Sequence, residues 1–147
     1  MIISPTLEKR IQYRIKKSKA SVFMLKDFLD LSDSDQIIRA LRKLIKKNLI
    51  IKAGKGVYVK ARISQFSEEI IPVINITEIA KIVAQKTNNT VIPNKYEMWY
   101  NEGKSTQIPT GRVVAVIGRI NRKIGFNNSF VTYEQVRNTE KYYSRPL

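Results

Sequence analysis

The segment around residues 34–48 constrains the fold of this chain more than any other part of the sequence. Its apolar residues recur at i, i+1, i+4, i+7 and i+8, which is the spacing of one helix face. They are Ile37, Ile38, Leu41, Leu44 and Ile45. The preceding turn offers two capping-box spacings, Ser32 with Asp35 or Asp33 with Gln36. The sequence therefore predicts an amphipathic helix that ends near Asn48.

One helix and two short elements are predicted before this amphipathic helix. Ser4 and Pro5 favour a helix start, and Leu7, Ile11 and Ile15 then recur every four residues, so we predict a first helix over about residues 5–17. A β-prone run at 21–23 follows. A helix-compatible run at 25–29 comes next and contains Phe28, a candidate core anchor.

Two strand-like runs, 49–52 and 57–60, follow the amphipathic helix and flank Gly54 and Gly56, which favours a β-hairpin. Helix, short strand, short helix, amphipathic helix and hairpin is the order of a winged helix-turn-helix. In that fold the second helix of the pair enters the major groove and the hairpin touches the DNA backbone.

The second half predicts a small α/β domain with an antiparallel sheet. Helices are expected after Asn75 and after Asn94, which has Glu97 at capping-box spacing. Strands are expected at 90–92 and 113–117, and a hairpin around 127–129. Trp99 and Tyr100 are expected in the core, and the polar tail from Arg137 is expected to fray. The predicted class is α+β, with a winged helix-turn-helix in residues 1–62 and the second domain in 63–147.

Net charge is the strongest signal in the composition. The chain carries a net charge of +15. Residues 1–62 hold 16 Lys and Arg against five Asp and Glu, whereas residues 63–147 hold 11 against seven. Such a surplus favours a polyanionic partner, because neutralised phosphates release condensed counterions. A basic surface that only keeps the protein soluble is the alternative interpretation.

The residue types that are missing exclude several function classes. The chain has no Cys and no His, which rules out thiolate or imidazole zinc sites, Cys nucleophiles and Ser-His triads. No pair of carboxylates stands out for acid–base chemistry. We therefore expect no enzyme activity, cofactor or metal. No apolar run approaches the roughly 18 residues of a membrane span, and the N-terminus does not resemble a signal peptide, so a soluble cytoplasmic protein is expected.

Residues near the N-terminus of a recognition helix reach base edges, where Gln pairs with adenine and Arg with guanine. The candidate base contacts are Ser34, Gln36, Arg39, Arg42 and Lys43. Ser34 has the alternative role of a helix cap, and Arg39 is the favoured contact. The candidate phosphate contacts are Lys46, Lys47, Lys52, Lys55 and Lys60. Lys46 and Lys47 are equally well explained as a solvated helix end.

A second basic strip is predicted around the late strands from four residues: Arg112, Arg119, Arg122 and Lys123. The strip is a candidate for binding phosphate or an acidic protein. Scattered solvated charges are the alternative.

Several short motifs resemble AbiEi-type antitoxins of bacterial type IV toxin–antitoxin systems. In the first half they are Val22-Phe23, Lys26-Asp27-Phe28, Ile38-x-Ala40-Leu41-x-x-Leu44 and Gly56-x-Tyr58. In the second half they are Ser105-Thr106-Gln107-Ile108-Pro109 and Gly118-Arg119-x-x-Arg122-Lys123. Met24-Leu25 departs from the Thr-Pro helix start expected of the family, and the C-terminal part is short. The resemblance implies an N-terminal domain that binds operator repeats and a C-terminal domain that counters a nucleotidyltransferase-type toxin.

These observations support a sequence-specific, DNA-binding transcriptional regulator, with autorepression of a toxin–antitoxin operon implied by the resemblance. The alternative is a non-catalytic RNA-binding protein, in which exposed Tyr side chains stack on single-stranded bases. A carboxylate-dependent nuclease is disfavoured because no region clusters enough acidic residues.

Overall fold

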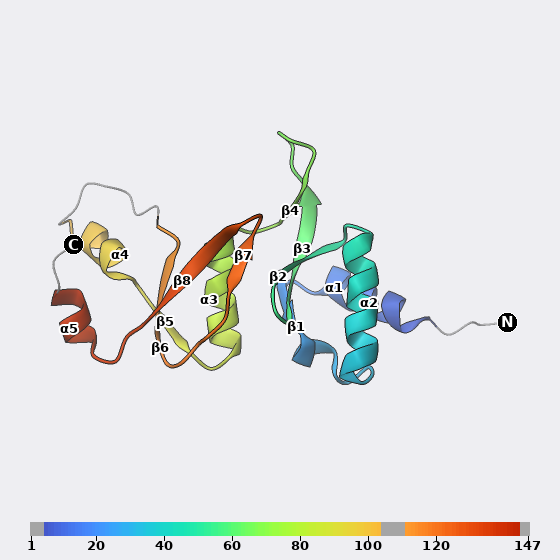
Figure 1. The fold of residues 1–147 in the computed structure, drawn as a ribbon, viewed down its shortest axis with the longest axis horizontal. Helices are drawn as coiled ribbons and strands as arrows, with labels where there is room; N and C mark the ends of the chain where they lie inside the picture. Colours follow the sequence, from blue (N-terminus) through green and yellow to red (C-terminus); the bar gives the residue numbers. More distant parts are fainter. Residues whose placement is uncertain (1–4, 104–110, 145–147) are drawn as a thin grey trace. The chain divides into compact units, whose positions relative to one another are not determined.

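The computed structural model describes residues 5–103 and 111–144 and is a mixed α+β structure, as predicted. It forms two compact units, Met1–Asn75 and Ile76–Leu147 (Figure 1). The predicted boundary lay between residues 62 and 63. Residues 63–75 stay with the first unit because β4 (Ile70–Pro72) pairs with β3 (Val57–Ile63). Among the described residues no helix is long and apolar enough to cross a membrane.

The helices of the first unit are α1 (Leu7–Lys17), the 3-10 helix η1 (Leu25–Phe28) and α2 (Ser34–Lys46). The predicted start of α1 at Ser4 and Pro5 was wrong, because Thr6 caps the helix and its hydroxyl accepts a hydrogen bond from the Lys9 amide at 3.3 Å. Asp33 caps α2, since its carboxylate accepts from the Gln36 amide at 2.9 Å. Asn48 follows α2 with φ of 60°, the left-handed conformation that closes helices.

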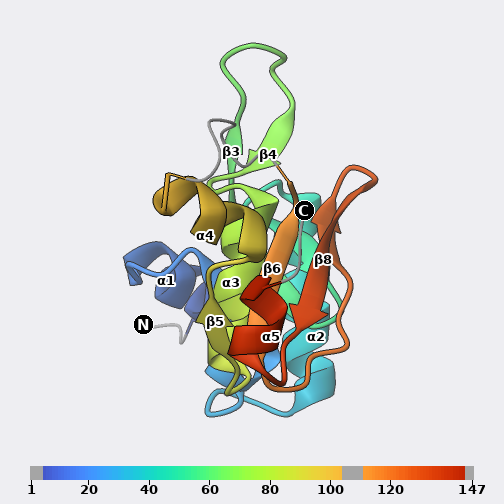
Figure 2. The same ribbon diagram turned by 90° about the vertical axis from the view of Figure 1, so that its left-hand side faces the viewer.

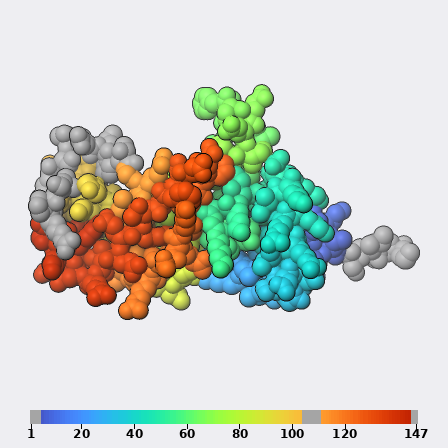
Figure 3. Space-filling model, in the orientation of Figure 1, coloured from blue at the N-terminus to red at the C-terminus, as the bar shows by residue number. Residues whose placement is uncertain are grey.

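The sheet of the first unit joins β1 (Val22–Met24), β3 and β2 (Ile50–Gly54) in the order β1-β3-β2, with antiparallel pairing. Gly56 turns the β2–β3 hairpin with φ of 69°. The β3–β4 hairpin continues beyond β2 and protrudes from the unit (Figures 1 and 3).

One apolar cluster holds the helices of the first unit to its sheet. Ile11 of α1, Leu41 and Leu44 of α2, and Phe28 are fully buried in it, and Tyr58 contributes from β3. Arg14 of α1 also ties itself to the segment after η1, because its guanidinium binds both carboxylate oxygens of Asp30 at 2.6 and 2.8 Å. The full burial of Phe28 in this cluster confirms it as the predicted core anchor.

The second unit contains α3 (Ile76–Lys86), β5 (Thr90–Ile92), α4 (Lys95–Asn101), β6 (Val113–Ile117), β7 (Ile124–Phe126), β8 (Ser129–Gln135) and α5 (Thr139–Ser144). The strand order is β5-β6-β8-β7, and α3 lies against this sheet (Figure 2). The sheet is antiparallel except between β6 and β8, which run parallel. The parallel pair was not predicted, and it arises because the chain returns through residues 118–123 and β7 before β8 begins.

Two predictions for the second unit were wrong. The tail after Arg137 does not fray through its length, because α5 is anchored by Tyr142, whose hydroxyl accepts from the Lys95 amide at 3.1 Å. Burial raises the pKa of Tyr142 to about 12. Trp99 is only half-buried and Tyr100 is exposed, since α4 contributes no fully buried residue to the core.

The cap of α2 gives a first testable prediction. Asp33→Ala should lower the free energy of unfolding by about 1 kcal/mol, because the Gln36 amide loses its acceptor at the helix N-terminus. Ser34→Ala is the matched control, one residue further on, and should change stability by less than about 0.5 kcal/mol because the Asp33 cap remains. Urea unfolding followed by circular dichroism measures both. Equal losses of stability in the two variants would show that the Asp33 side chain does not stabilise α2 as a cap.

Candidate nucleic-acid interface

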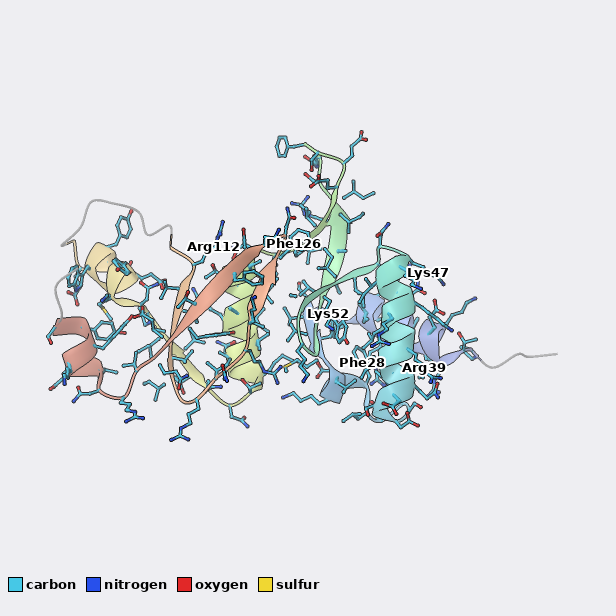
Figure 4. All side chains as sticks on the ribbon, viewed as in Figure 1. Phe28, Arg39, Lys47, Lys52, Arg112 and Phe126 are labelled. Atoms are coloured by element: carbon cyan, nitrogen blue, oxygen red, sulfur yellow. The ribbon has the colours of Figure 1, made fainter. Side chains whose placement is uncertain are left out.

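The face of α2 that points away from the core is cationic along most of its length. Ile37, Leu41 and Leu44 are fully buried on one side of the helix. A helix turns about 100° per residue, which places the opposite side near residues 35, 39, 42 and 46. The exposed basic residues on and beside this side are Arg39, Arg42, Lys43 and Lys46. Figure 4 labels Arg39 on α2. Gln36 is exposed at the edge of the same face.

Ser34 does not join these residues. It occupies the first position of α2, directly after the Asp33 cap, and is half-buried. Helix geometry turns it about 160° away from Gln36, toward the side that carries Leu41. Of the five candidate base contacts, the structure therefore brings together Gln36, Arg39, Arg42 and Lys43 and separates Ser34 from them.

Asp35 belongs to the exposed face of α2 but was not among the candidate contacts predicted from the sequence. It is exposed in the first turn of α2 and lies four residues before Arg39, so the two share one face. The sequence offered Asp35 as a partner in a capping box, and that role is excluded now that Asp33 is the cap. A carboxylate in this position can accept a hydrogen bond from cytosine.

The β2–β3 hairpin extends the basic face of α2. Lys52 of β2 lies directly opposite Tyr58 of β3, so both side chains are on the same face of the sheet. Burial raises the pKa of the Tyr58 hydroxyl, and the nearby positive charge of Arg42 partly offsets this rise. Tyr58 packs in the same apolar cluster as Leu41 and Leu44 of α2. Lys52 therefore lies on the face of the sheet against which α2 packs. Figure 4 labels Lys52 on this hairpin.

The tip of the hairpin carries an exposed cation, Lys55, between Gly54 and Gly56. We call the basic residues of α2 and this hairpin the α2–hairpin surface. It consists of Arg39, Arg42, Lys43, Lys46, Lys52 and Lys55.

Two of the five candidate phosphate contacts, Lys47 and Lys60, bind other groups of the same chain. The Lys47 ammonium pairs with the Glu8 carboxylate of α1 at 2.5 Å. The Lys60 ammonium donates to the carbonyl oxygen of Ser18, at the end of α1, at 2.6 Å. Both contacts join segments that are far apart in the sequence, so residue spacing could not reveal them. Their charges are directed to α1 rather than to the α2–hairpin surface.

The four residues of the predicted second basic strip are all exposed, and two of them lie at opposite ends of β6. Arg112 precedes β6 and Arg119 follows it, so the five residues of β6 separate them. Lys123 lies next to Phe130, with its ammonium 4.2 Å from the ring centre. Arg119 instead lines a hollow of about 460 Å³ with Arg137, at the carboxyl ends of β6 and β8.

The described residues contain no group of three or more Asp and Glu side chains placed to hold a metal ion. The segment Ser105–Pro109, which carries part of the resemblance noted above, lies outside the described residues.

The Lys47–Glu8 pair gives a second prediction. The hydrogen bond from Lys47 holds the pKa of the Glu8 carboxyl below its ordinary value of 4.5. A lowered pKa in the folded state means that the pair stabilises the protein above the unfolded-state pKa and loses this effect as the pH falls through the folded-state pKa. NMR titration should show a low Glu8 pKa that returns toward its ordinary value in Lys47→Met. An unchanged Glu8 pKa in that variant would contradict the pairing.

Comparison with known proteins identifies a family but no curated relative or solved structure. A search of curated proteins finds no match. A search of solved structures finds none either. The model of a family described as "Family of unknown function (DUF6088)" matches residues 9–141, which is nearly the whole chain and includes both units. The protein therefore belongs to the DUF6088 family.

Proposed function

We propose that the first unit is a winged helix-turn-helix and that the protein is a sequence-specific regulator that binds double-stranded DNA. The α2–hairpin surface carries this proposal. A helix whose buried edge is fixed by the core presents a cationic, solvent-exposed face, and a glycine-turned hairpin extends that face. Helix and hairpin are the two elements with which winged helices contact DNA.

The proposed roles follow the position of each residue along α2. Asp35, Gln36 and Arg39 occupy its first turns and are exposed, so they are the candidate base contacts. Arg42 and Lys43 follow one turn later, where side chains meet either bases or phosphates. Lys46, Lys52 and Lys55 lie at the helix end and on the hairpin, and they are assigned to phosphates. Phosphate contacts raise affinity and salt dependence without adding sequence preference.

Duplex DNA fits this surface better than RNA does. The major groove of B-DNA, about 12 Å wide, admits a helix, whereas the deep and narrow groove of A-form RNA does not. Single-stranded RNA is bound largely by bases stacking on aromatic side chains. The α2–hairpin surface consists of cations, and its neighbour Tyr58 is buried in the core. The RNA-binding alternative therefore lacks a stacking platform on this surface.

We further propose that the regulator is an antitoxin that represses its own operon in a bacterial toxin–antitoxin system. The resemblance of the short motifs to those of AbiEi-type antitoxins supports this proposal. The test is to express a nucleotidyltransferase-type gene found beside this one, with and without the present protein. Growth arrest that this protein relieves supports the antitoxin role. Arrest that persists removes that role and leaves the DNA-binding proposal intact.

The proposed function is tested first by a mobility shift with the DNA upstream of the gene, at about 150 mM salt, near physiological ionic strength. Excess nonspecific duplex and a structured RNA serve as competitors. A discrete complex that resists both competitors is expected. Equal affinity for the upstream DNA and a scrambled duplex would remove the claim of sequence specificity, and preferential displacement by RNA would favour the alternative.

Arg39 gives a third prediction. Arg39→Ala should weaken binding to the specific site by about 1–3 kcal/mol and leave binding to random duplex almost unchanged, because a base contact contributes only where the base is correct. Lys16→Ala, an exposed charge removal on α1, is the matched control and should affect neither. Titration of both duplexes by fluorescence anisotropy measures the difference. An equal loss on random DNA would make Arg39 a phosphate contact.

Lys55 gives a fourth prediction. Lys55→Ala should lower the slope of log K against log salt by about one unit, because one fewer phosphate is neutralised. Lys141→Ala, in α5 of the second unit, removes an exposed charge that is not part of the α2–hairpin surface and should leave the slope unchanged. Affinities measured across about 50–200 mM salt give the slopes. A slope identical to that of the wild type in Lys55→Ala would mean that the hairpin tip does not contact DNA.

A further inference from the structure

The β3–β4 hairpin exposes two large apolar side chains on an element that protrudes from the first unit. β3 pairs with β2 as far as Lys60, and beyond that point it pairs with β4, through residues 61–63 and 70–72. We call residues 61–72 the arm. Phe66, in the turn of the arm, is 99% exposed, and Ile63 is 63% exposed. Figure 3 shows the arm standing out from the first unit. Phe66 and Ile63 together make the arm a candidate interaction site, because apolar side chains grouped on one exposed element favour contact with a partner.

The turn of the arm is ordered by hydrogen bonds. The Ser64 amide donates to the Glu69 carbonyl at 2.8 Å, and the Glu68 amide donates to the Ser64 carbonyl at 3.1 Å. The buried Ser64 hydroxyl accepts from the amides of Phe66 at 3.2 Å and Ser67 at 3.4 Å. These bonds fix the backbone that presents Phe66 to solvent. A preorganised turn loses less conformational entropy when it binds a partner.

The charge of the arm indicates the kind of partner. Glu68 and Glu69 are adjacent and exposed in the turn, and Arg62 is the only basic residue of the arm. The rest of the first unit is strongly basic, with 15 Lys and Arg against five Asp and Glu in residues 1–60. Two carboxylates beside the exposed ring repel nucleic-acid phosphates. They favour a basic protein surface with an apolar floor.

The first unit itself offers such a surface. A hollow of about 880 Å³ runs along α1 and reaches Leu31. Tyr13, 63% exposed, and Leu31 supply apolar lining, and Lys9, Arg10 and Lys17 supply positive charge. We call this hollow the α1 groove. The arm and the α1 groove are therefore complementary in both polarity and charge.

We propose that the arm of one copy of this chain docks into the α1 groove of a second copy, and that the second copy does the same in return. Phe66 lies against Tyr13 and Leu31, while Glu68 and Glu69 pair with the groove cations. Phe66 is almost fully exposed, so the arm does not occupy the groove of its own chain. Reciprocal exchange uses the same two patches on both copies and closes into a two-fold dimer. The proposal does not depend on DNA binding.

Sedimentation equilibrium of the full chain over about 1–200 μM, spanning the range of weak to moderate affinities, tests the dimer. The wild type should dimerise, and Phe66→Ala should raise the dimer dissociation constant at least about 30-fold, as expected for a buried aromatic anchor. Gln65→Ala, beside Phe66 in the same exposed turn, is the matched control and should dimerise as the wild type does. Circular dichroism confirms that each variant folds. A monomer at every concentration, or a dimer insensitive to Phe66→Ala, overturns the proposal.

Charge exchange identifies the partner surface. Glu68→Lys with Glu69→Lys should abolish the dimer, as should Lys9→Glu with Arg10→Glu, because each places like charges together. Mixing the two variants should restore a heterodimer, since the basic arm of one then faces the acidic groove of the other. Failure of the mixture to associate would overturn the assignment of the groove.

The absence of cysteine from the chain allows an unambiguous cross-link. Gln65→Cys and Lys17→Cys, prepared separately and mixed under oxidising conditions, should form a disulfide heterodimer. Asn48→Cys, at the end of α2, replaces Lys17→Cys as the control and should not cross-link above the random level. When both cysteines are in one chain, a disulfide that leaves the chain monomeric would place the arm in its own groove and overturn the exchange.

Discussion

The fully buried edge of α2 is the constraint on which the rest of the first unit depends. Ile37, Leu41 and Leu44 fill the space between α1 and the sheet, and each contributes about 1.5–3 kcal/mol by leaving water. Rotation of α2 about its axis would expose these residues, so the helix has one orientation. That orientation directs Arg39 and Arg42 to solvent. The basic surface is therefore a consequence of packing, and the same core fixes the hairpin beside it through Tyr58.

Net charge alone overstates the surface available to a polyanion. Arg14 binds Asp30, Lys47 binds Glu8, and Lys60 binds the carbonyl at the end of α1. These contacts join α1 to its neighbours and fix where helix α1 lies. Much of the remaining charge lies on the α2–hairpin surface, and Lys9, Arg10 and Lys17 line the α1 groove. The structure thus separates cations that hold the unit together from cations that are directed outward, a distinction that composition cannot make.

The arm and the α1 groove add a second kind of chemistry to the same unit. The α2–hairpin surface is cationic and suits phosphates, whereas the arm combines an aromatic ring with carboxylates and suits a basic, apolar groove. A dimer formed through the arms would present two copies of α2. Two-fold DNA-binding proteins use this arrangement to contact two half-sites. The surface proposed for DNA and the surfaces proposed for the second copy consist of different residues, so the two proposed contacts do not compete for them.

The sequence by itself determined the local elements, because periodicity and caps act over a few residues. It predicted α2 from Ile37, Leu41 and Leu44, the closing role of Asn48, the hairpin at Gly56 and the capping box of Asn94 with Glu97. Only the tertiary structure decided which basic side chains pair with other groups of the same chain. Lys47 and Glu8 are 39 residues apart, and Lys60 and Ser18 are 42 apart. The parallel β6–β8 pair, the anchoring of α5 by Tyr142 and the extension of β3 into the arm likewise depend on contacts between distant segments. Local sequence patterns do not predict such contacts, because the contacts form only when the folded chain brings their distant partners together.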